Sequence, residues 1–312
     1  MLYYAQLGLG NPPKQYYVQV DTGSDILWVN CAPCDTYPKS SGLGIRLTLY
    51  NPDKSNSGST VTCDQSFCGL ASQTQSAQGC QSDQRYEYNV QYGDGSSTTG
   101  YFVKDTLQYN EVTGNFTTTP ANASVIFGCG FQQSGELQSS DEALDGILGF
   151  GQSNTSLISQ LALSGKVPKI FSHCLDGDIG GGILTIGHVV QNRLDTTPLV
   201  SNQPHYNVNL TKIEVDGAVL NVDQMVFETS DKAGTIIDSG TTLAYISEPA
   251  YKPLLSAITA AEPGLQYSIQ QGTICFNYDG SVDKAFLTIT FYFEGSLRMQ
   301  AICQTYASRG NK

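Results

Sequence analysis

Short runs of β-branched and aromatic residues, bounded by Gly, Asp, Asn or Pro, recur along most of the chain. Runs of this length and composition are typical of β-strands. They predict strands at Tyr16–Val20, Tyr86–Tyr92, Tyr101–Leu107, Ser124–Phe127, Ile183–Gly187, Tyr206–Val215, Thr235–Ile237 and Leu287–Phe293. We therefore expect a mainly β protein.

Two segments have features of a helix. A third segment shows neither the apolar spacing of a helix nor the alternation of a strand. Apolar residues recur at i, i+3, i+4 and i+7 at Tyr251, Leu254, Leu255 and Ile258. With Ser247 as an N-cap, this spacing predicts a helix over about 247–261, and a second helix is expected at about 155–163. Residues 35–83 are instead rich in Ser, Gly, Asn, Gln and Cys, which predicts a long excursion held by disulfides.

One local pattern occurs twice: a short apolar strand, an aspartate, a small hydroxyl residue, a glycine and a second hydroxyl residue. The copies are VQVDTGS at residues 18–24 and TIIDSGT at residues 235–241. Each strand would deliver its aspartate, Asp21 or Asp238, to a turn whose glycine lets the backbone fold back closely. The hydroxyls could donate hydrogen bonds to that carboxylate. One copy alone is typical of an ordinary turn, but two copies favour a duplicated half that supplies one carboxylate each.

A pair of facing carboxylates has a definite chemistry. Ionising both members would place two negative charges side by side, which costs free energy, so they share a proton and their pKa values separate. The ionised member can take a proton from a water held between them, and this water attacks a peptide carbonyl. The protonated member donates to the developing oxyanion. The repeat thus predicts hydrolysis of peptide bonds at acidic pH by Asp21 and Asp238, with no cofactor, metal or covalent intermediate.

The composition excludes several other classes of protein. The 312 residues are 40% hydrophobic and 14% charged, with a net charge of −12, which excludes a disordered tail, a coiled coil and a basic nucleic-acid binder. The length suggests two domains or one large all-β unit. No window has 18 uninterrupted apolar residues, so no membrane span is expected, and residues 1–4 lack the features of a secretion signal.

Cysteines and glycosylation sequons nevertheless point to an oxidising compartment. The chain has nine cysteines, and sequons begin at Asn115, Asn122, Asn154 and Asn209. We expect a secreted, extracellular or vacuolar protein whose leader is absent from this sequence. The spacing of Cys31 and Cys34 could also bind zinc, although no second pair accompanies it. For Cys174, beside His173, we expect a disulfide with Cys129 rather than a nucleophilic role, because adjacent strand residues point to opposite faces.

Four motifs carry a family resemblance. They are VDTGSDILWVNC at 20–31, QYGDGS at 91–96, DGILGFG at 145–151 and IIDSGTT at 236–242. On these motifs the chain resembles pepsin-type aspartic endopeptidases, specifically the plant nepenthesin-like branch, over residues 1 to about 297. The resemblance implies an all-β fold of two pseudo-twofold lobes with a central cleft and a few short helices. The N-terminal lobe would span 1–195, with the Asp21 loop, the cysteine-rich insertion and the flap, and the C-terminal lobe 196–312, with the Asp238 loop.

The resemblance also implies roles for the residues of the two aspartate turns. Asp21 and Asp238 match the catalytic pair, and Gly23 and Gly240 match the glycines of the two turns. Thr22 and Ser239 match the residues whose hydroxyls cross-link the two catalytic loops. Ser24 and Thr241 match those bonded to the outer carboxylate oxygens.

Three further matches lie outside the aspartate turns. Tyr92 and Gly93 match the tip of the flap, a hairpin that closes over substrate. Trp28 matches the residue whose indole N–H meets the flap tyrosine. The segment 147–149 matches the strand that supports the first catalytic loop.

The resemblance further implies a polypeptide substrate and a monomer. Residues 241–312 contain no counterpart of 147–149, and residues 298–312 are short and polar, so we expect an incomplete C-terminal lobe in which 298–312 lacks a strand partner. Two alternatives stay open. One is a catalytically inactive binding protein on this fold, as in plant xylanase inhibitors, which usually lose part of the aspartate motifs; the other is a truncated pseudo-enzyme.

Overall fold

Strands dominate the computed structural model, as the sequence predicts. The described residues are 3–34, 36–71, 80–112, 114, 117–176, 180–190, 193–230, 233–261, 263–264, 266–270, 273–277 and 286–301. The chain forms two compact units. The first comprises Met1–Val190 with Asp238–Gly240, and the second comprises Gln191–Ile237 with Thr241–Lys312. Within the described residues, no helix is long and apolar enough to cross a membrane.

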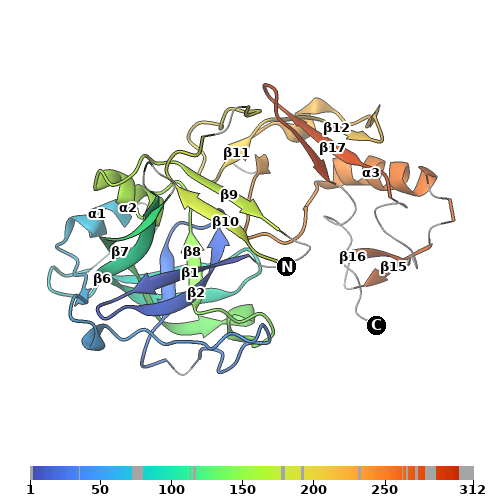
Figure 1. Ribbon diagram of the computed structural model, residues 1–312. Helices are drawn as coiled ribbons and strands as arrows, with labels where there is room; N and C mark the ends of the chain where they lie inside the picture. The colour runs from blue at the N-terminus through green and yellow to red at the C-terminus, as the bar shows by residue number, and fades with distance from the viewer. Residues whose placement is uncertain are drawn as a thin grey trace. The chain divides into compact units, whose positions relative to one another are not determined.

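One large sheet forms the body of the first unit (Figure 1). Its strands run in the order β1 (Tyr4–Leu9), β2 (Lys14–Asp21), β8 (Gly146–Gly149), β3 (Leu27–Asn30), β7 (Thr118–Ser134), β6 (Ser97–Val112) and β4 (Ser59–Thr60). The strand β5 (Glu87–Gln91) pairs with β6, and β1 also pairs with β6. Because β1 pairs with both β2 and β6, the sheet closes on itself.

The short strand β8 lies between β2 and β3, parallel to β2 and antiparallel to β3. Its register places Gly149 opposite Asp21, the last residue of β2. An ideal Cβ at Gly149 would lie 2.5 Å from the carbonyl carbon of Asp25, so only a glycine fits. The next residue, Phe150, donates its N–H to the Asp21 carbonyl oxygen at 2.7 Å. The segment predicted to support the first aspartate loop therefore contacts it directly.

The two faces of this sheet bury different apolar clusters. On β2 the alternating residues Val18 and Val20 are 0% and 2% exposed and belong to the larger cluster. Its largest fully buried members are Leu9, Tyr16, Leu27, Tyr50, Phe127, Leu148, Phe150 and Leu157. The second cluster gathers Trp28, Val61, Phe67, Tyr86, Tyr88, Phe102 and Ile147. The alternation of inward and outward side chains leaves Asp21 at the end of a strand that is held by the core.

Short helices and a hairpin complete the first unit. They are α1 (Ser66–Ala71), α2 (Leu157–Leu163), β9 (Phe171–Leu175), β10 (Gly182–Ile186) and two 3₁₀ turns, Pro52–Lys54 and Gly135–Gln138. The helix predicted at 155–163 begins at Leu157, because Ser156 is extended and caps it by accepting a hydrogen bond from the Ser159 N–H.

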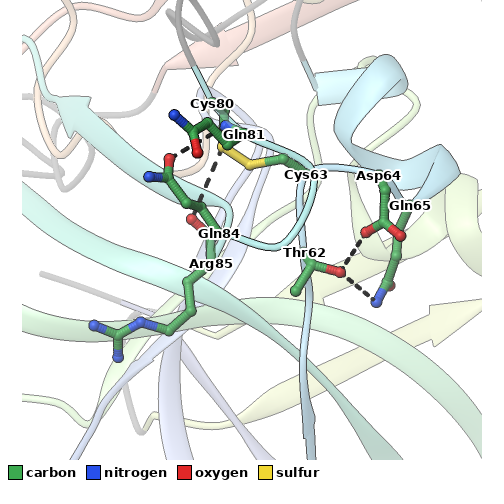
Figure 2. Close-up of a disulfide and its surroundings, with 8 residues drawn as sticks. All are labelled: Thr62, Cys63, Asp64, Gln65, Cys80, Gln81, Gln84 and Arg85. Carbon is green, nitrogen blue, oxygen red and sulfur yellow. Dashed lines mark hydrogen bonds between the residues drawn. A yellow bond between two sulfur atoms is a disulfide. The ribbon is translucent and has the colours of Figure 1, made fainter.

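Among the described residues, one disulfide lies within the cysteine-rich excursion and another lies just before it. Cys63 and Cys80 close a loop within it, flanked by the short turns that Figure 2 shows at Thr62 and Gln81. Cys31 joins Cys129 on β7. Since the latter bridge closes a loop of 98 residues, loop-closure entropy gives it a stabilising effect of about 4–5 kcal/mol.

The predicted bridge between Cys174 and Cys129 is wrong. Parallel pairing sets Val29 of β3 opposite Cys129, so Cys31, just past the end of β3, lies 5.2 Å away between Cα atoms. Cys174 lies on β9, is exposed and forms no disulfide with any cysteine in the part of the chain that the structure describes. The bridge also removes Cys31 as a zinc ligand.

In the second unit, the described residues form three small sheets and one α-helix. The strand β11 (Asn207–Val208) pairs with β14 (Thr235–Ile236), and a four-stranded sheet runs β13 (Ala218–Val219), β12 (Leu210–Val215), β17 (Ile289–Phe293) and β18 (Arg298–Ala301). The same unit also has the hairpin of β15 (Gln266–Gln270) and β16 (Thr273–Asn277), the helix α3 (Glu248–Ala261) and a 3₁₀ turn at Gln224–Phe227. The buried face of α3, at Ala250, Leu254 and Ile258, belongs to the same apolar cluster as residues of β12 and β17.

The prediction that 298–312 lacks a strand partner is wrong for its first residues. Arg298–Ala301 pair antiparallel with β17, with Tyr292 opposite Arg298 and Ile289 opposite Ala301. The alternation of polar and apolar residues is too short here to identify a strand from sequence. Residues 302–312, including Cys303, lie outside the described residues.

Candidate active site

Asp21 lies where β2 ends, and only 6% of its surface is exposed. The turn that follows wraps back onto its carboxylate. The Gly23 N–H donates to Asp21 Oδ1 at 2.8 Å, and the Ser24 hydroxyl donates to Oδ2. Both contacts follow from the Asp-Thr-Gly-Ser sequence, because the turn brings its N–H and its hydroxyl back to the preceding carboxylate.

The glycine contact recurs at Asp238. This residue follows β14, and the Gly240 N–H donates to Asp238 Oδ1 at 2.8 Å. Asp238–Gly240 belong to the first compact unit, together with the Asp21 turn. Thr241 belongs to the second unit, and its predicted contact with the outer oxygen of Asp238 stays a prediction.

The structure brings the two aspartate turns together, and each glycine faces the opposite aspartate. An ideal Cβ on Gly23 would lie 2.5 Å from Asp238 Oδ2 and 2.7 Å from its Cγ. An ideal Cβ on Gly240 would overlap Asp21 Oδ1 and lie 3.2 Å from Asp238 Oδ1. The absence of a side chain at both glycines is therefore what lets the carboxylates approach each other.

Reciprocal hydrogen bonds lock the turns to each other. The Thr22 N–H donates to Ser239 Oγ at 3.2 Å, and the Ser239 N–H donates to Thr22 Oγ1 at 2.9 Å. The Ser239 hydroxyl donates onward to the Val20 carbonyl oxygen at 2.9 Å. Thr22 is buried, with 4% of its surface exposed, so these bonds are shielded from water. The two residues predicted to cross-link the loops do so.

Burial is the largest influence on the pKa of Asp21. Burial, the charge of Asp238 and a hydrogen bond between the two carboxyls together raise this pKa to about 6. The Ser24 hydroxyl and the Gly23 N–H stabilise the ionised form and act in the opposite direction. Asp21 therefore holds its proton to a much higher pH than an exposed aspartate.

Tyr92 and Gly93 lie in the tight turn between β5 and β6. The turn is closed by the Tyr92 N–H, which donates to the Ser96 carbonyl oxygen at 2.9 Å, and Gly93 is exposed at its tip. The Trp28 indole N–H donates to the Tyr92 hydroxyl at 2.7 Å, as the family resemblance predicts. Tyr92 is also hydrogen-bonded to Ser24, and burial raises its pKa above the usual range. A chain of contacts thus links Trp28, Tyr92, Ser24 and Asp21.

Two polar residues that support the aspartate turns were not singled out from the sequence. Asp145, just before β8, is 1% exposed and accepts the N–H of Tyr17 at 2.8 Å and of Thr48 at 2.6 Å. Burial raises its pKa to about 6. It ties β8 to β2 at the end remote from Asp21, and its place before the glycine of DGILG is the signal that could have identified it.

The second residue is Gln19, two positions before Asp21 on β2. Its Nε2 donates to the Gly240 carbonyl oxygen at 3.3 Å, a contact that spans 221 residues of sequence. The strand alternation puts Gln19 on the same face as Asp21, so this position also could have been found from sequence.

Comparisons with protein families match both parts of the chain. A family model described as Xylanase inhibitor N-terminal matches residues 3–188, and one described as Xylanase inhibitor C-terminal matches residues 205–308. The predicted end of the resemblance at about residue 297 is therefore too early, because the polar tail carries less recognisable sequence than the aspartate motifs.

Curated relatives carry names of aspartic proteinases. Aspartic proteinase 36 and aspartic proteinase 39 of Arabidopsis thaliana are 47% and 43% identical to this chain, each over 98% of it. Aspartic proteinase nepenthesin-2 of Nepenthes gracilis is 30% identical over 82% of the chain and 55% of its own length. The chain spans 63% of the length of each of the two Arabidopsis relatives.

Proposed function

The chain belongs to the plant pepsin-type aspartic proteases, and we propose that it is an endopeptidase that hydrolyses peptide bonds at acidic pH through a water activated between Asp21 and Asp238. One carboxyl is ionised and takes a proton from the water as it attacks the peptide carbonyl. The other is protonated and donates to the oxyanion that develops. When the tetrahedral gem-diol collapses, the protonated carboxyl donates its proton to the leaving amine nitrogen and the C–N bond breaks. One gem-diol hydroxyl gives its proton to the ionised carboxylate, so the pair is again singly protonated.

The observation that supports this proposal most strongly is the reciprocal geometry of the two turns. Each glycine faces the opposite aspartate, and the Thr22 and Ser239 cross-links hold both turns. A general acid and a general base must lie within reach of one small molecule, and this arrangement supplies two carboxyls in that relation. The raised pKa of Asp21 supports its protonation at acidic pH.

We propose that the turn at Tyr92 and Gly93 covers the substrate. The proposal is supported by the exposure of Gly93 and by the anchoring of the Tyr92 hydroxyl on the Trp28 indole at 2.7 Å. A hairpin of this kind can exclude water from the reacting carbonyl when substrate is present.

The proposed substrate is a polypeptide, and the proposed state of the chain is a monomer. A binding protein without catalysis, the kind of protein named in the matching family models, is the alternative. The retention of both aspartate motifs and the names of the curated relatives support the protease.

The shared proton predicts how the activity depends on pH. Because the pKa of Asp21 is raised to about 6, its proton is present below that pH and is lost as the pH rises through it. We expect kcat for cleavage of a denatured protein to be highest between about pH 3 and 5 and to fall roughly tenfold per unit above pH 6. Circular dichroism at each pH would show that the chain remains folded. A kcat that stays constant to pH 8 would remove the shared proton from the mechanism.

We propose a secreted or vacuolar location, supported by the two disulfides. Its test is glycosylation. Asn122 and Asn154 are exposed, whereas Asn209 is half-buried and donates its side-chain N–H to Glu294 Oε2 at 2.7 Å; Asn115 lies outside the described residues. On a chain isolated from plant tissue, mass spectrometry is expected to find glycans at Asn122 and Asn154 and an unmodified Asn209. A chain unmodified at both exposed sites would count against the location.

A further inference from the structure

Gln19 occupies a position beside the aspartate pair that has no polar counterpart in the second copy of the repeat. On β2 the side chains of Val18 and Val20 enter the core, so Gln19 and Asp21 share the opposite face. Aligning the two aspartates of the repeat sets Gln19 against Ile236, whose side chain cannot form a hydrogen bond.

Because Ile236 replaces Gln19 in the second copy, the hydrogen bond that Gln19 makes to the opposite turn has no counterpart in the reverse direction. The Thr22 and Ser239 bonds are reciprocal, with each turn donating to the other. The bond from Gln19 Nε2 to the Gly240 carbonyl oxygen, at 3.3 Å, runs from the Asp21 strand to the Asp238 turn. This bond therefore anchors the Asp238 turn to β2, the strand that ends at Asp21.

Gly240, which accepts this hydrogen bond, contacts both aspartates. Its N–H donates to Asp238 Oδ1 at 2.8 Å, and its Cα faces Asp21 closely enough that a Cβ would overlap Asp21 Oδ1. A shift of the Gly240 backbone would therefore move the Asp238 carboxylate relative to Asp21.

We propose that Gln19 is a positioning residue that fixes the Asp238 turn, and thereby the distance between the two carboxylates, through the Gly240 carbonyl. The expected effect on kcat rests on the proposed protease function. The expected effect on the position of the Asp238 turn rests only on the hydrogen bond from Gln19 to Gly240. Gln19 acts through Gly240 and touches no reacting atom.

The first test replaces Gln19 by methionine, which has a similar length and no N–H. In Gln19→Met we expect kcat to fall about tenfold with KM unchanged, because small displacements of catalytic groups slow the chemical step more than they weaken binding. Gln15→Met is the matched control, since Gln15 lies on the same face of the same strand and is exposed. It is expected to retain wild-type kcat.

The second test uses Gln19→Glu, which can restore the bond in one protonation state. Below about pH 4 the neutral carboxylic acid can donate to the Gly240 carbonyl, while its ionised form cannot. The titratable groups beside it are Asp21 and Tyr17 on the same face of β2, Asp238 in the facing turn, and Tyr4, opposite Gln19 on β1. We expect near wild-type kcat at pH 3 and a loss of tenfold or more by pH 5.5.

A third measurement is independent of catalysis. Hydrogen–deuterium exchange of the native chain is expected to be faster across residues 238–241 in Gln19→Met than in the wild type, and unchanged in Gln15→Met. If the wild-type chain does not cleave protein, the proposed function fails, and the exchange result alone decides the role of Gln19. Unchanged exchange, or a kcat loss that Gln19→Glu does not restore at pH 3, would overturn the proposal.

Discussion

Asp21→Asn is expected to lower kcat by about 10⁴-fold while the chain stays folded. An amide of nearly the same shape neither takes a proton from water nor shares one with Asp238. Its oxygen can still accept the Gly23 N–H, which now donates to Asp21 Oδ1 at 2.8 Å. Steady-state cleavage of a denatured protein at pH 4 measures the effect.

Thermal unfolding checks that this variant is folded, and the raised pKa of Asp21 predicts the direction in which the unfolding temperature changes. Because burial raises the pKa of Asp21 to about 6, ionising it at pH 7 destabilises the folded chain. The substituted amide carries no such charge, so Asp21→Asn is expected to unfold at the same temperature as wild type, or a higher one, at pH 7. Asp141→Asn, at an exposed position of the same unit, is the matched control and is expected to keep full activity. Wild-type kcat in Asp21→Asn would exclude this carboxylate from the mechanism.

Gly240→Ala is expected to reduce kcat/KM by about 10²-fold or more, the second largest effect. The added Cβ would overlap Asp21 Oδ1 and lie 2.7 Å from Asp21 Cγ, so the two turns would have to separate. Displacement of about 1 Å between catalytic groups is enough for a loss of this size. The same overlap is expected to lower the free energy of unfolding by about 1–3 kcal/mol, measured by urea denaturation.

The control for this substitution is Gly69→Ala in α1. An ideal Cβ at Gly69 meets no atom within 4 Å, so both activity and stability are expected to stay at wild-type levels. Activity of Gly240→Ala within threefold of wild type would show that the turns do not approach as closely as the structure has them.

The sequence identifies the aspartate turns because their chemistry is local. The Asp-Thr-Gly-Ser spacing places an N–H and a hydroxyl within reach of Asp21 whatever the rest of the fold, and both hydrogen bonds are present. The bond between Trp28 and Tyr92 was predicted only through the family resemblance, because it joins residues 64 positions apart. The geometry at Tyr92 agrees with that prediction.

Features that depend on strand pairing could not be predicted in the same way. The partner of Cys129 is decided by the parallel pairing of β3 with β7, which no periodicity reveals. The short strand β18 depends on β17 as a template. Gln19 was within reach of sequence reasoning, since its face of β2 follows from alternation, but its bond to Gly240 requires the two turns to be in place.

Cleavage of a denatured protein at pH 4 by the purified 312-residue chain, with and without pepstatin, tests the central claim most directly. The two facing aspartates predict peptide-bond cleavage that pepstatin, an inhibitor of aspartic proteases, abolishes. A folded chain that cleaves nothing, or whose cleavage continues undiminished in the presence of pepstatin, would contradict it.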